Sequence, residues 1–197
     1  MRYSDPVHVR AAVYANARGV IYSDPLGFGK DGAVWLAKDE FGSTRAVKVF
    51  EREEAFRQEL RVYQRLSKHT IVKVGQHSVP VLRDHDETLG VLGMTVVTAP
   101  YILDFASATL DAPPDFPRHV MRERERHWLS VFGPDRWSRV QTVLVALERL
   151  GIHYLDPTRR NIAFHPDEEA AWDVALAASD ETDHSPDPAS DSDGTDD

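Results

Sequence analysis

The sequence predicts an α+β fold, because closely spaced strand patterns are followed by helical ones. Residues 18–50 contain three apolar, β-branched runs separated by Gly-rich or polar turns, which predicts an antiparallel meander. Strand patterns return at residues 79–83 and 89–97. One helical pattern, over residues 52–67, interrupts these strands.

The helix expected over residues 52–67 carries an acidic residue on its apolar side. The residues that recur there at helical spacing are Phe56, Glu59, Tyr63 and Leu66. A carboxylate on a buried face needs a partner, and Lys48 on the preceding strand is the nearest candidate. The alternative is a Glu at the edge of the stripe, in contact with water.

The second half of the chain is expected to be mainly helical. Residues 101–117 are rich in Pro and read as a loop or linker. Helical patterns follow at residues 118–131 and 135–150. Pro134 stands at the start of the second of these helices and Gly151 just past its end, as is typical of helix termini.

Composition narrows the class of protein. The 197 residues contain no Cys, which excludes disulfide scaffolds, thiolate zinc sites and Cys nucleophiles. The formal net charge is −9, but eight acidic residues and no Lys or Arg lie in residues 179–197. The rest of the chain is therefore nearly neutral, and we expect it to bind no nucleic acid. The acidic tail is expected to be disordered.

The sequence also bears on location. The longest uncharged stretch, residues 88–103, is shorter than the roughly 20 apolar residues that a membrane-spanning helix needs. The first residues contain no continuous apolar run of the kind found in secretory signals. We therefore expect a cytoplasmic protein that does not bind membranes.

A glycine-rich segment lies between the first two predicted strands. Residues 27–34 read GFGKDGAV, which is the pattern G-x-G-x-x-G-x-V. A dinucleotide-binding loop would need a helix after the glycines, and a Walker loop would need a Lys after the last one. A strand pattern follows instead, which favours a hairpin whose backbone N–H groups can approach phosphates. An ordinary Gly-rich hairpin is the alternative.

Two further segments carry chemistry in a defined order. Lys48 lies in the strand context Ala46-Val47-Lys48-Val49, where a Lys on a sheet face can contact phosphate. Asp156 and Asn161 have the D-x-x-x-x-N spacing of a catalytic loop, in which Asp accepts a hydroxyl proton and Asn holds Mg²⁺. A solvent-facing Lys and a helix-capping turn are the alternatives.

Together and in this order, these features resemble the eukaryotic-like, bacterial-type Ser/Thr protein kinase family, over residues 18–165. The resemblance implies a protein kinase-like bilobed fold. Its N-lobe would be an antiparallel five-stranded sheet with one helix, and its C-lobe would be abbreviated and mainly helical. The expected parts are an N-terminal extension (1–17), an N-lobe (18–100), a C-lobe with the catalytic loop (101–178) and the acidic tail (179–197).

The resemblance further implies a site for ATP and Mg²⁺, with the adenine against a hinge near residues 98–101. Lys48 would contact the α- and β-phosphates and act in catalysis with Asp156, the catalytic base. Asn161 and Asp173 would hold the metal. The other residues expected in the nucleotide site are Gly27, Phe28, Gly29, Gly32, Val34, Ala46 and Glu59.

The sequence departs from this family in ways that leave the function open. The H-R-D motif reads Tyr154-Leu155-Asp156, and Asp173 is the only candidate for a D-F-G Asp after Asn161. The later helices of the family's large lobe have no counterpart, so we expect a partner or self-association to cover apolar helix faces. The resemblance implies γ-phosphoryl transfer to a Ser or Thr hydroxyl of a protein substrate. The alternatives are a nucleotide-binding pseudokinase that acts as a scaffold or regulator, and a small-molecule kinase.

Overall fold

The computed structural model describes residues 5–170. Of these, residues 5–163 belong to one compact unit, and a second unit begins at residue 164. Within the second unit, residues 166–170 are helical. Asp173 and the acidic tail lie outside the described residues.

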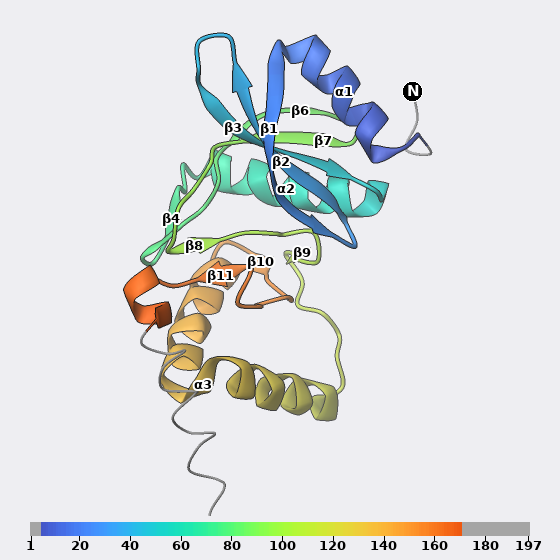
Figure 1. Cartoon of the computed structure of the whole chain (residues 1–197). Helices are drawn as coiled ribbons and strands as arrows, with labels where there is room; N and C mark the ends of the chain where they lie inside the picture. The colour runs from blue at the N-terminus through green and yellow to red at the C-terminus, as the bar shows by residue number, and fades with distance from the viewer. Residues whose placement is uncertain (1–4, 171–197) are drawn as a thin grey trace, which may run out of the picture. The chain divides into compact units, whose positions relative to one another are not determined.

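The first unit contains both helices and strands, which confirms the predicted α+β class (Figure 1). Its first half consists of α1 (Val7–Arg18), β1 (Val20–Gly29), β2 (Gly32–Asp39), β3 (Thr44–Phe50), α2 (Glu53–Lys68), β4 (Lys73–Val74), β5 (His77–Ser78), β6 (Leu82–Asp86) and β7 (Val91–Met94). Its second half consists of β8 (Tyr101–Ile102), β9 (Thr109–Leu110), α3 (Arg118–Glu148), β10 (Ile152–His153) and β11 (Ile162–Ala163).

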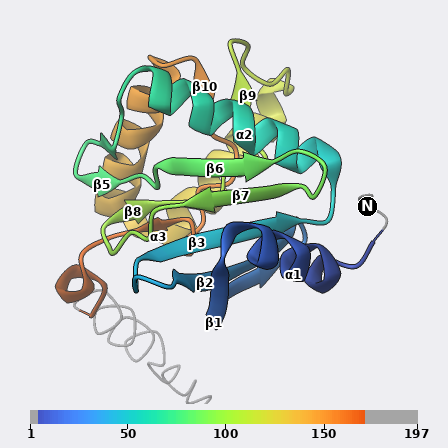
Figure 2. The ribbon, with the colours of Figure 1, turned by 90° about the horizontal axis from the view of Figure 1, so that it is seen from above.

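Five of the strands form the predicted antiparallel sheet, in the order β1-β2-β3-β7-β6, and Figure 2 shows them side by side. The helix predicted over residues 52–67 is α2. It begins and ends within a residue of that range, and all the residues of its predicted stripe are buried. Phe50 at the end of β3 meets Phe56 of α2 edge to face, with the ring centroids 5.7 Å apart. The sheet and α2 thus pack against each other as two layers.

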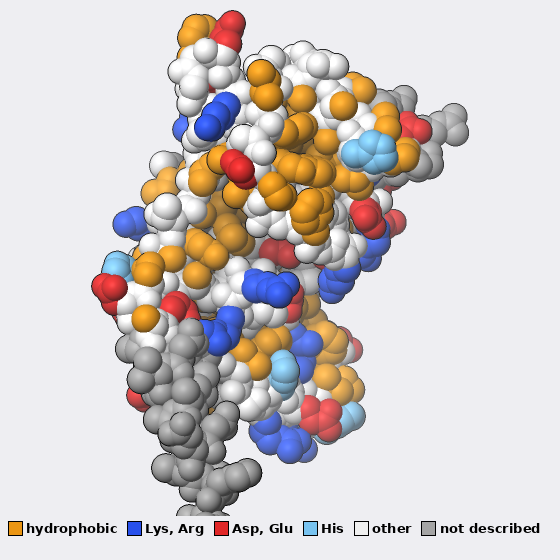
Figure 3. Space-filling view, viewed as in Figure 1, with side chains coloured by type: hydrophobic (Ala, Val, Ile, Leu, Met, Phe, Trp, Pro, Cys, Tyr) orange, Lys and Arg blue, Asp and Glu red, His pale blue; other side chains and the backbone are white. Residues whose placement is uncertain are grey.

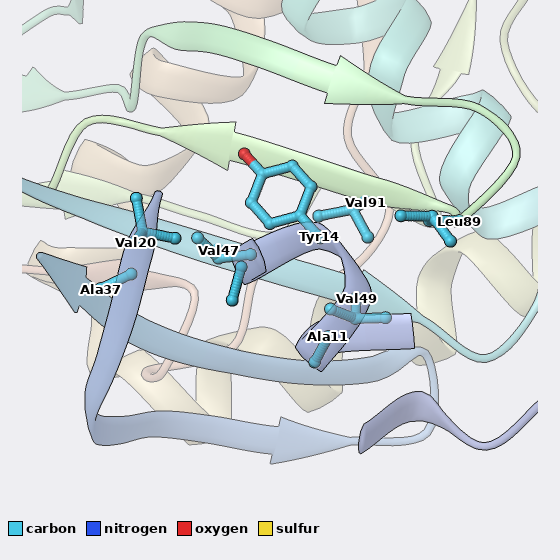
Figure 4. Close-up of a cluster of buried hydrophobic side chains, with 9 residues drawn as sticks. Ala11, Tyr14, Val20, Ala37, Val47, Val49, Leu89 and Val91 are labelled. Atoms are coloured by element: carbon cyan, nitrogen blue, oxygen red, sulfur yellow. The ribbon is translucent and has the colours of Figure 1, made fainter. Parts of the chain in front are cut away.

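The sequence analysis predicted no helix before residue 18, whereas α1 occupies most of that segment. α1 packs on one face of the sheet, where Figure 4 shows Ala11 and Tyr14 against Val47, Val49 and Val91. Side chains alternate between the two faces of a strand. Because Val47 and Val49 face α1, their neighbours on β3 face the opposite side, towards α2.

Arg10 attaches α1 to the sheet from inside the core. Its guanidinium donates to the carbonyl oxygens of Leu89 and Phe50, each at 2.6 Å. A buried guanidinium is tolerated only where acceptors satisfy it, and here the last carbonyl of β3 and a carbonyl in the turn before β7 do so. Tyr14 also donates its hydroxyl hydrogen to Asp84, and burial raises the pKa of Tyr14.

Residues 101–117 were predicted as a loop, and this is wrong at two places. β8 pairs in antiparallel register with β11, and β9 pairs with β10. The segment before α3 is therefore joined through backbone hydrogen bonds to the segment after it. Strands of two residues are too short to show a period in the sequence.

α3 contains the two predicted helices joined at a kink. Gly133 has a left-handed φ of 71° and interrupts the helix directly before Pro134. The half before the kink exposes Met121 and Leu129, so some of the apolar surface predicted to be uncovered is exposed. Figure 3 shows charged and apolar side chains mixed over this region. Among residues 5–170, no helix has both the length and the apolar content needed to cross a bilayer.

We predict that Gly93→Ala lowers the free energy of unfolding by about 1 to 3 kcal/mol, because it overpacks the contact between α1 and β7. A Cβ at Gly93 would lie 2.5 Å from the Tyr14 hydroxyl oxygen and 2.9 Å from Asp84 Oδ1. Urea unfolding measures the change. In a Tyr14→Phe background the same substitution should cost less, since the nearest atom is gone. An equal cost in both backgrounds would contradict this account.

Candidate functional site

A cavity of about 910 Å³ lies between the glycine hairpin, the inner face of β3 and the loop over residues 156–161. Every site residue predicted within the described chain lines this one cavity. These residues are Gly27, Phe28, Gly29, Gly32, Val34, Ala46, Lys48, Glu59, Asp156 and Asn161. Apolar side chains, among them Leu26, Met94 and Leu103, line the same cavity. The cavity therefore combines an apolar wall with a charged end, as ligand sites commonly do.

Lys48 supplies the charge at the floor of the cavity. Its side chain projects from β3 on the face opposite α1, and it is buried. Lys48 Nζ donates to Glu59 Oε2 at 2.6 Å, so the predicted ion pair is present. Lys48 Nζ also donates to Asp104 Oδ1 at 3.0 Å, a partner that the sequence analysis did not predict.

Burial and charge act in opposite directions on this cluster. Burial alone would lower the pKa of Lys48, but the carboxylates of Glu59 and Asp104 raise it. The ammonium therefore stays protonated at neutral pH. Burial raises the pKa of Glu59 to about 7, against the opposing effect of Lys48. At neutral pH, Glu59 is thus close to the midpoint of its protonation.

The glycine hairpin joins β1 to β2 and forms the roof of the cavity. Gly32 has φ +145°, and a Cβ there would lie 2.1 Å from the carbonyl oxygen of Val49, so this position requires Gly. Asp31 next to it forms an ion pair with Arg52, which immediately precedes α2. The amide of Glu51 donates to the carbonyl oxygen of Asp31 at 3.1 Å. The inner end of the hairpin is thereby attached to the connection between β3 and α2.

The loop over residues 156–161 is closed by its own hydrogen bonds. Asn161 Nδ2 donates to the carbonyl oxygen of Asp156 at 3.1 Å and to its Oδ2 at 3.2 Å. The amide of Thr158 donates to the same carbonyl oxygen at 2.9 Å. These bonds orient the Asp156 carboxylate and leave the Asn161 side-chain oxygen as the group suited to a cation.

Asp104 reaches the cavity because β8 lies against β11. The amide of Leu103 donates to the carbonyl oxygen of Asn161 at 2.8 Å, so the backbone before Asp104 lies beside the end of the 156–161 loop. Asp104 has a left-handed φ of 58°. A non-Gly residue in that region is strained, and such strain is characteristic of functional sites.

Phe105, next to Asp104, packs in the core and holds the Asp104 segment in place. It is fully buried and meets Tyr63 of α2 edge to face, with the ring centroids 5.5 Å apart. It meets Tyr154 in the same way at 5.4 Å, and the Tyr154 hydroxyl donates to the carbonyl oxygen of Leu103 at 2.6 Å. The ring of Phe105 thus packs α2 against the segments that carry Asp104 and Asp156.

Sequence reasoning missed Asp104, although a signal for it exists. Residues 104–106 read Asp-Phe-Ala, which is similar to the D-F-G motif sought after Asn161. The D-F-G Asp was expected downstream of Asn161, where the sequence has Asp173, and Asp173 lies outside the described residues. Asp104 stands before α3 and comes to Asn161 only through the pairing of β8 with β11.

The donor set suits a hard cation that shares its ligands with a substrate. Within residues 5–170, no group of three or more His, Cys, Asp or Glu side chains could hold a metal alone. Mg²⁺ is usually held by one or two carboxylates together with substrate phosphates. Asp104 and Asn161 are the carboxylate and amide that line this cavity for such a role, beside Asp156.

Comparisons with protein-family models and with curated proteins find no match to this chain. The residues of the cavity and their contacts are therefore what indicates a function.

We predict that the free energy of unfolding of the wild type, relative to that of Glu59→Gln, falls as the pH rises from about 4.5 to about 7. The pKa of Glu59 rises from 4.5 to about 7 on folding, so the folded state binds the proton more tightly across this window. Urea unfolding of both proteins at several pH values gives the difference in free energy. A difference that grows with pH instead would mean that Lys48 lowers the pKa of Glu59 below its ordinary value.

Proposed function

We propose that this protein is an ATP-dependent phosphotransferase that moves the γ-phosphoryl group to a hydroxyl, with a protein Ser or Thr as the expected acceptor. One observation carries the proposal. A buried Lys48 pairs with Glu59 and Asp104 in the same cavity that holds a glycine hairpin, Asp156 and Asn161. The resemblance to protein kinases supports this assignment through the order of most of these residues.

The cavity suits a nucleotide triphosphate in both of its parts. The apolar walls, which include Val34, Ala46 and Met94, fit a flat purine base. The glycine hairpin offers backbone N–H groups above the phosphates, where side chains would block the approach. Lys48 offers a cation beneath them, held in place by Glu59.

Asp104 and Asn161 are the residues that would hold Mg²⁺. The Asp104 side chain is 36% exposed, so it is open to a ligand in spite of its contact with Lys48. When bound, Mg²⁺ would neutralise charge on the phosphate oxygens. Asp104 replaces Asp173 in this assignment, because Asp104 lines the cavity and Asp173 lies outside the described residues.

Asp156 is proposed to orient the acceptor hydroxyl and to accept its proton. Asn161 Nδ2 holds the carboxylate through Oδ2, so Oδ1 is the oxygen assigned to the substrate. Lys48 and the hairpin N–H groups stabilise the charge on the transferring group. Catalysis of this kind depends on position and electrostatics, and no covalent intermediate with the protein is needed.

We predict that Asp104→Asn abolishes the effect of Mg²⁺ on nucleotide binding and lowers phosphoryl transfer about a hundredfold or more. In the wild type, MgATP at about 100 times its Kd should stabilise the fold by about 2.7 kcal/mol, a shift of several degrees in Tm. Thermal unfolding with ATP, with and without Mg²⁺, measures this directly.

Asp173→Asn is the matched control, because it tests the Asp that chain order favours. It should leave both the Mg²⁺ effect and the transfer rate at wild-type level. The reverse pattern, with Asp173→Asn inactive and Asp104→Asn normal, would refute the assignment of Asp104.

We predict that Asp156→Asn keeps MgATP binding but loses transfer by about a hundredfold or more, because the proton acceptor is removed. Lys48→Met should weaken binding itself, since the buried carboxylate of Glu59 and the partly exposed carboxylate of Asp104 lose their cation. Radiolabelled ATP with general protein acceptors and with small hydroxyl compounds identifies the acceptor class. Tight MgATP binding with no transfer to any acceptor would favour the pseudokinase alternative.

A further inference from the structure

An ion pair outside the cavity joins three segments of the chain. Arg65, near the end of α2, donates from Nη2 to Asp111 Oδ2 at 2.8 Å and from Nη1 to the other carboxylate oxygen. Arg65 Nη1 also donates to the carbonyl oxygen of Leu150, which follows α3, at 3.1 Å. A guanidinium that binds a carboxylate through two nitrogens fixes both distance and orientation.

The backbone around this ion pair is shaped to accommodate it. Gly151 has φ +70°, and a Cβ there would lie 2.6 Å from Arg65 Nη1 and 2.8 Å from Asp111 Oδ1. Asp111 itself has a left-handed φ of 65°, and its amide donates to the carbonyl oxygen of Gly151 at 2.8 Å. A Cβ at position 151 would therefore displace the ends of both side chains from this contact, and the left-handed φ there also favours Gly.

Each of the three segments leads to a carboxylate of the cavity. α2 carries Glu59, and the chain that begins at Asp104 reaches Asp111 directly after β9. Gly151 leads through β10 to Asp156, and β10 pairs with β9. Neither Arg65 nor Asp111 lines the cavity. Any effect of this pair on the cavity must therefore pass through the segments that it joins.

We propose that Arg65 and Asp111 are positioning residues. They hold α2, the Asp104 segment and the Asp156 loop in the arrangement that phosphoryl transfer needs, and no covalent modification of the chain is required for this. The proposal rests on the proposed function, because it assigns these two residues to the same site. The carboxylate of Asp111 supplies the negative charge that binds Arg65 where the three segments meet.

Exposure separates a positioning role from a purely stabilising one. The Arg65 side chain is 26% exposed and that of Asp111 is 68% exposed. An ion pair in contact with water adds at most about 1 kcal/mol to the stability of a typical fold, bidentate Arg–carboxylate pairs being the stronger ones, and salt weakens it. The hydrogen bond from Arg65 lowers the pKa of Asp111, so the carboxylate stays charged well into the acidic range. The pair should therefore affect turnover more than unfolding.

The chain offers a matched control on the same helix. Arg57 forms an exposed ion pair with Glu53 one turn away on α2, and this pair contacts no other segment through the interactions described. Arg57→Ala removes an α2 arginine of the same type without touching the junction. Arg65→Ala and Asp111→Asn each remove the bidentate contact, and Asp111→Asn keeps the shape of the side chain.

The experiment measures kcat and KM for ATP in these variants, on protein shown by mass spectrometry to be unphosphorylated. We expect Asp111→Asn and Arg65→Ala to lower kcat about tenfold, with KM for ATP within twofold of the wild type. The double variant should be no slower than Arg65→Ala alone, because both substitutions remove the same contact. Arg57→Ala should match the wild type.

Salt provides a readout that a merely structural role would not change. Raising the ionic strength from about 0.05 to 0.5 M shortens the screening length several-fold, so wild-type kcat should fall, whereas kcat of Asp111→Asn should change less. Wild-type kcat retained in Asp111→Asn would overturn this inference and leave the proposed function intact. A wild type that transfers the phosphoryl group only after it has itself been phosphorylated would also overturn this inference and leave the proposed function intact. Absence of any transfer by the wild type would overturn both.

Discussion

The ammonium group of Lys48 is the charge around which the rest of the site is organised. It is buried on the inner face of the sheet, where an unpaired cation would be very costly. Its two carboxylate partners come from different places, Glu59 from α2 and Asp104 from the segment after β8. Pairing with both requires α2 to lie against β3, and β8 to lie beneath the sheet. The position of the cavity follows from these two requirements.

The site also shows that order in space differs from order along the chain. Asp104 precedes α3, and Asp156 and Asn161 follow it, yet β8 and β11 bring them to the same cavity. Phe105 between Tyr63 and Tyr154 fixes the same junction from the core. The sequence downstream of Asn161 therefore offers Asp173 for the metal, although the carboxylate that lines the cavity, that of Asp104, lies upstream.

Much of the fold could be predicted because its signals are periodic. Lys48 and Glu59 could be paired from the sequence, since one lies on a strand and the other on the apolar stripe of the next helix. Two-residue strands such as β8 could not be predicted, because they show no period, and Asp104 was missed because its place depends on such a strand. The helix α1 was missed although its sequence carries a helical signal. Its buried residues Ala11, Tyr14 and Ala15 recur at helical spacing, and Gly19 follows its end.

The pairing of β8 with β11 has a consequence for the order in which the molecule assembles. Proteins are synthesised from the N-terminus, so the sheet, α2 and Asp104 leave the ribosome before the 156–161 loop exists. Contacts between segments distant in sequence form late, because a long stretch of chain must first be ordered. The partly made chain can therefore pair Lys48 with Glu59, whereas Asp104 takes its place only when β11 pairs with β8. On this account the ion pair on the sheet forms during synthesis, and the carboxylates of Asp104 and Asp156 enter the cavity together near the end.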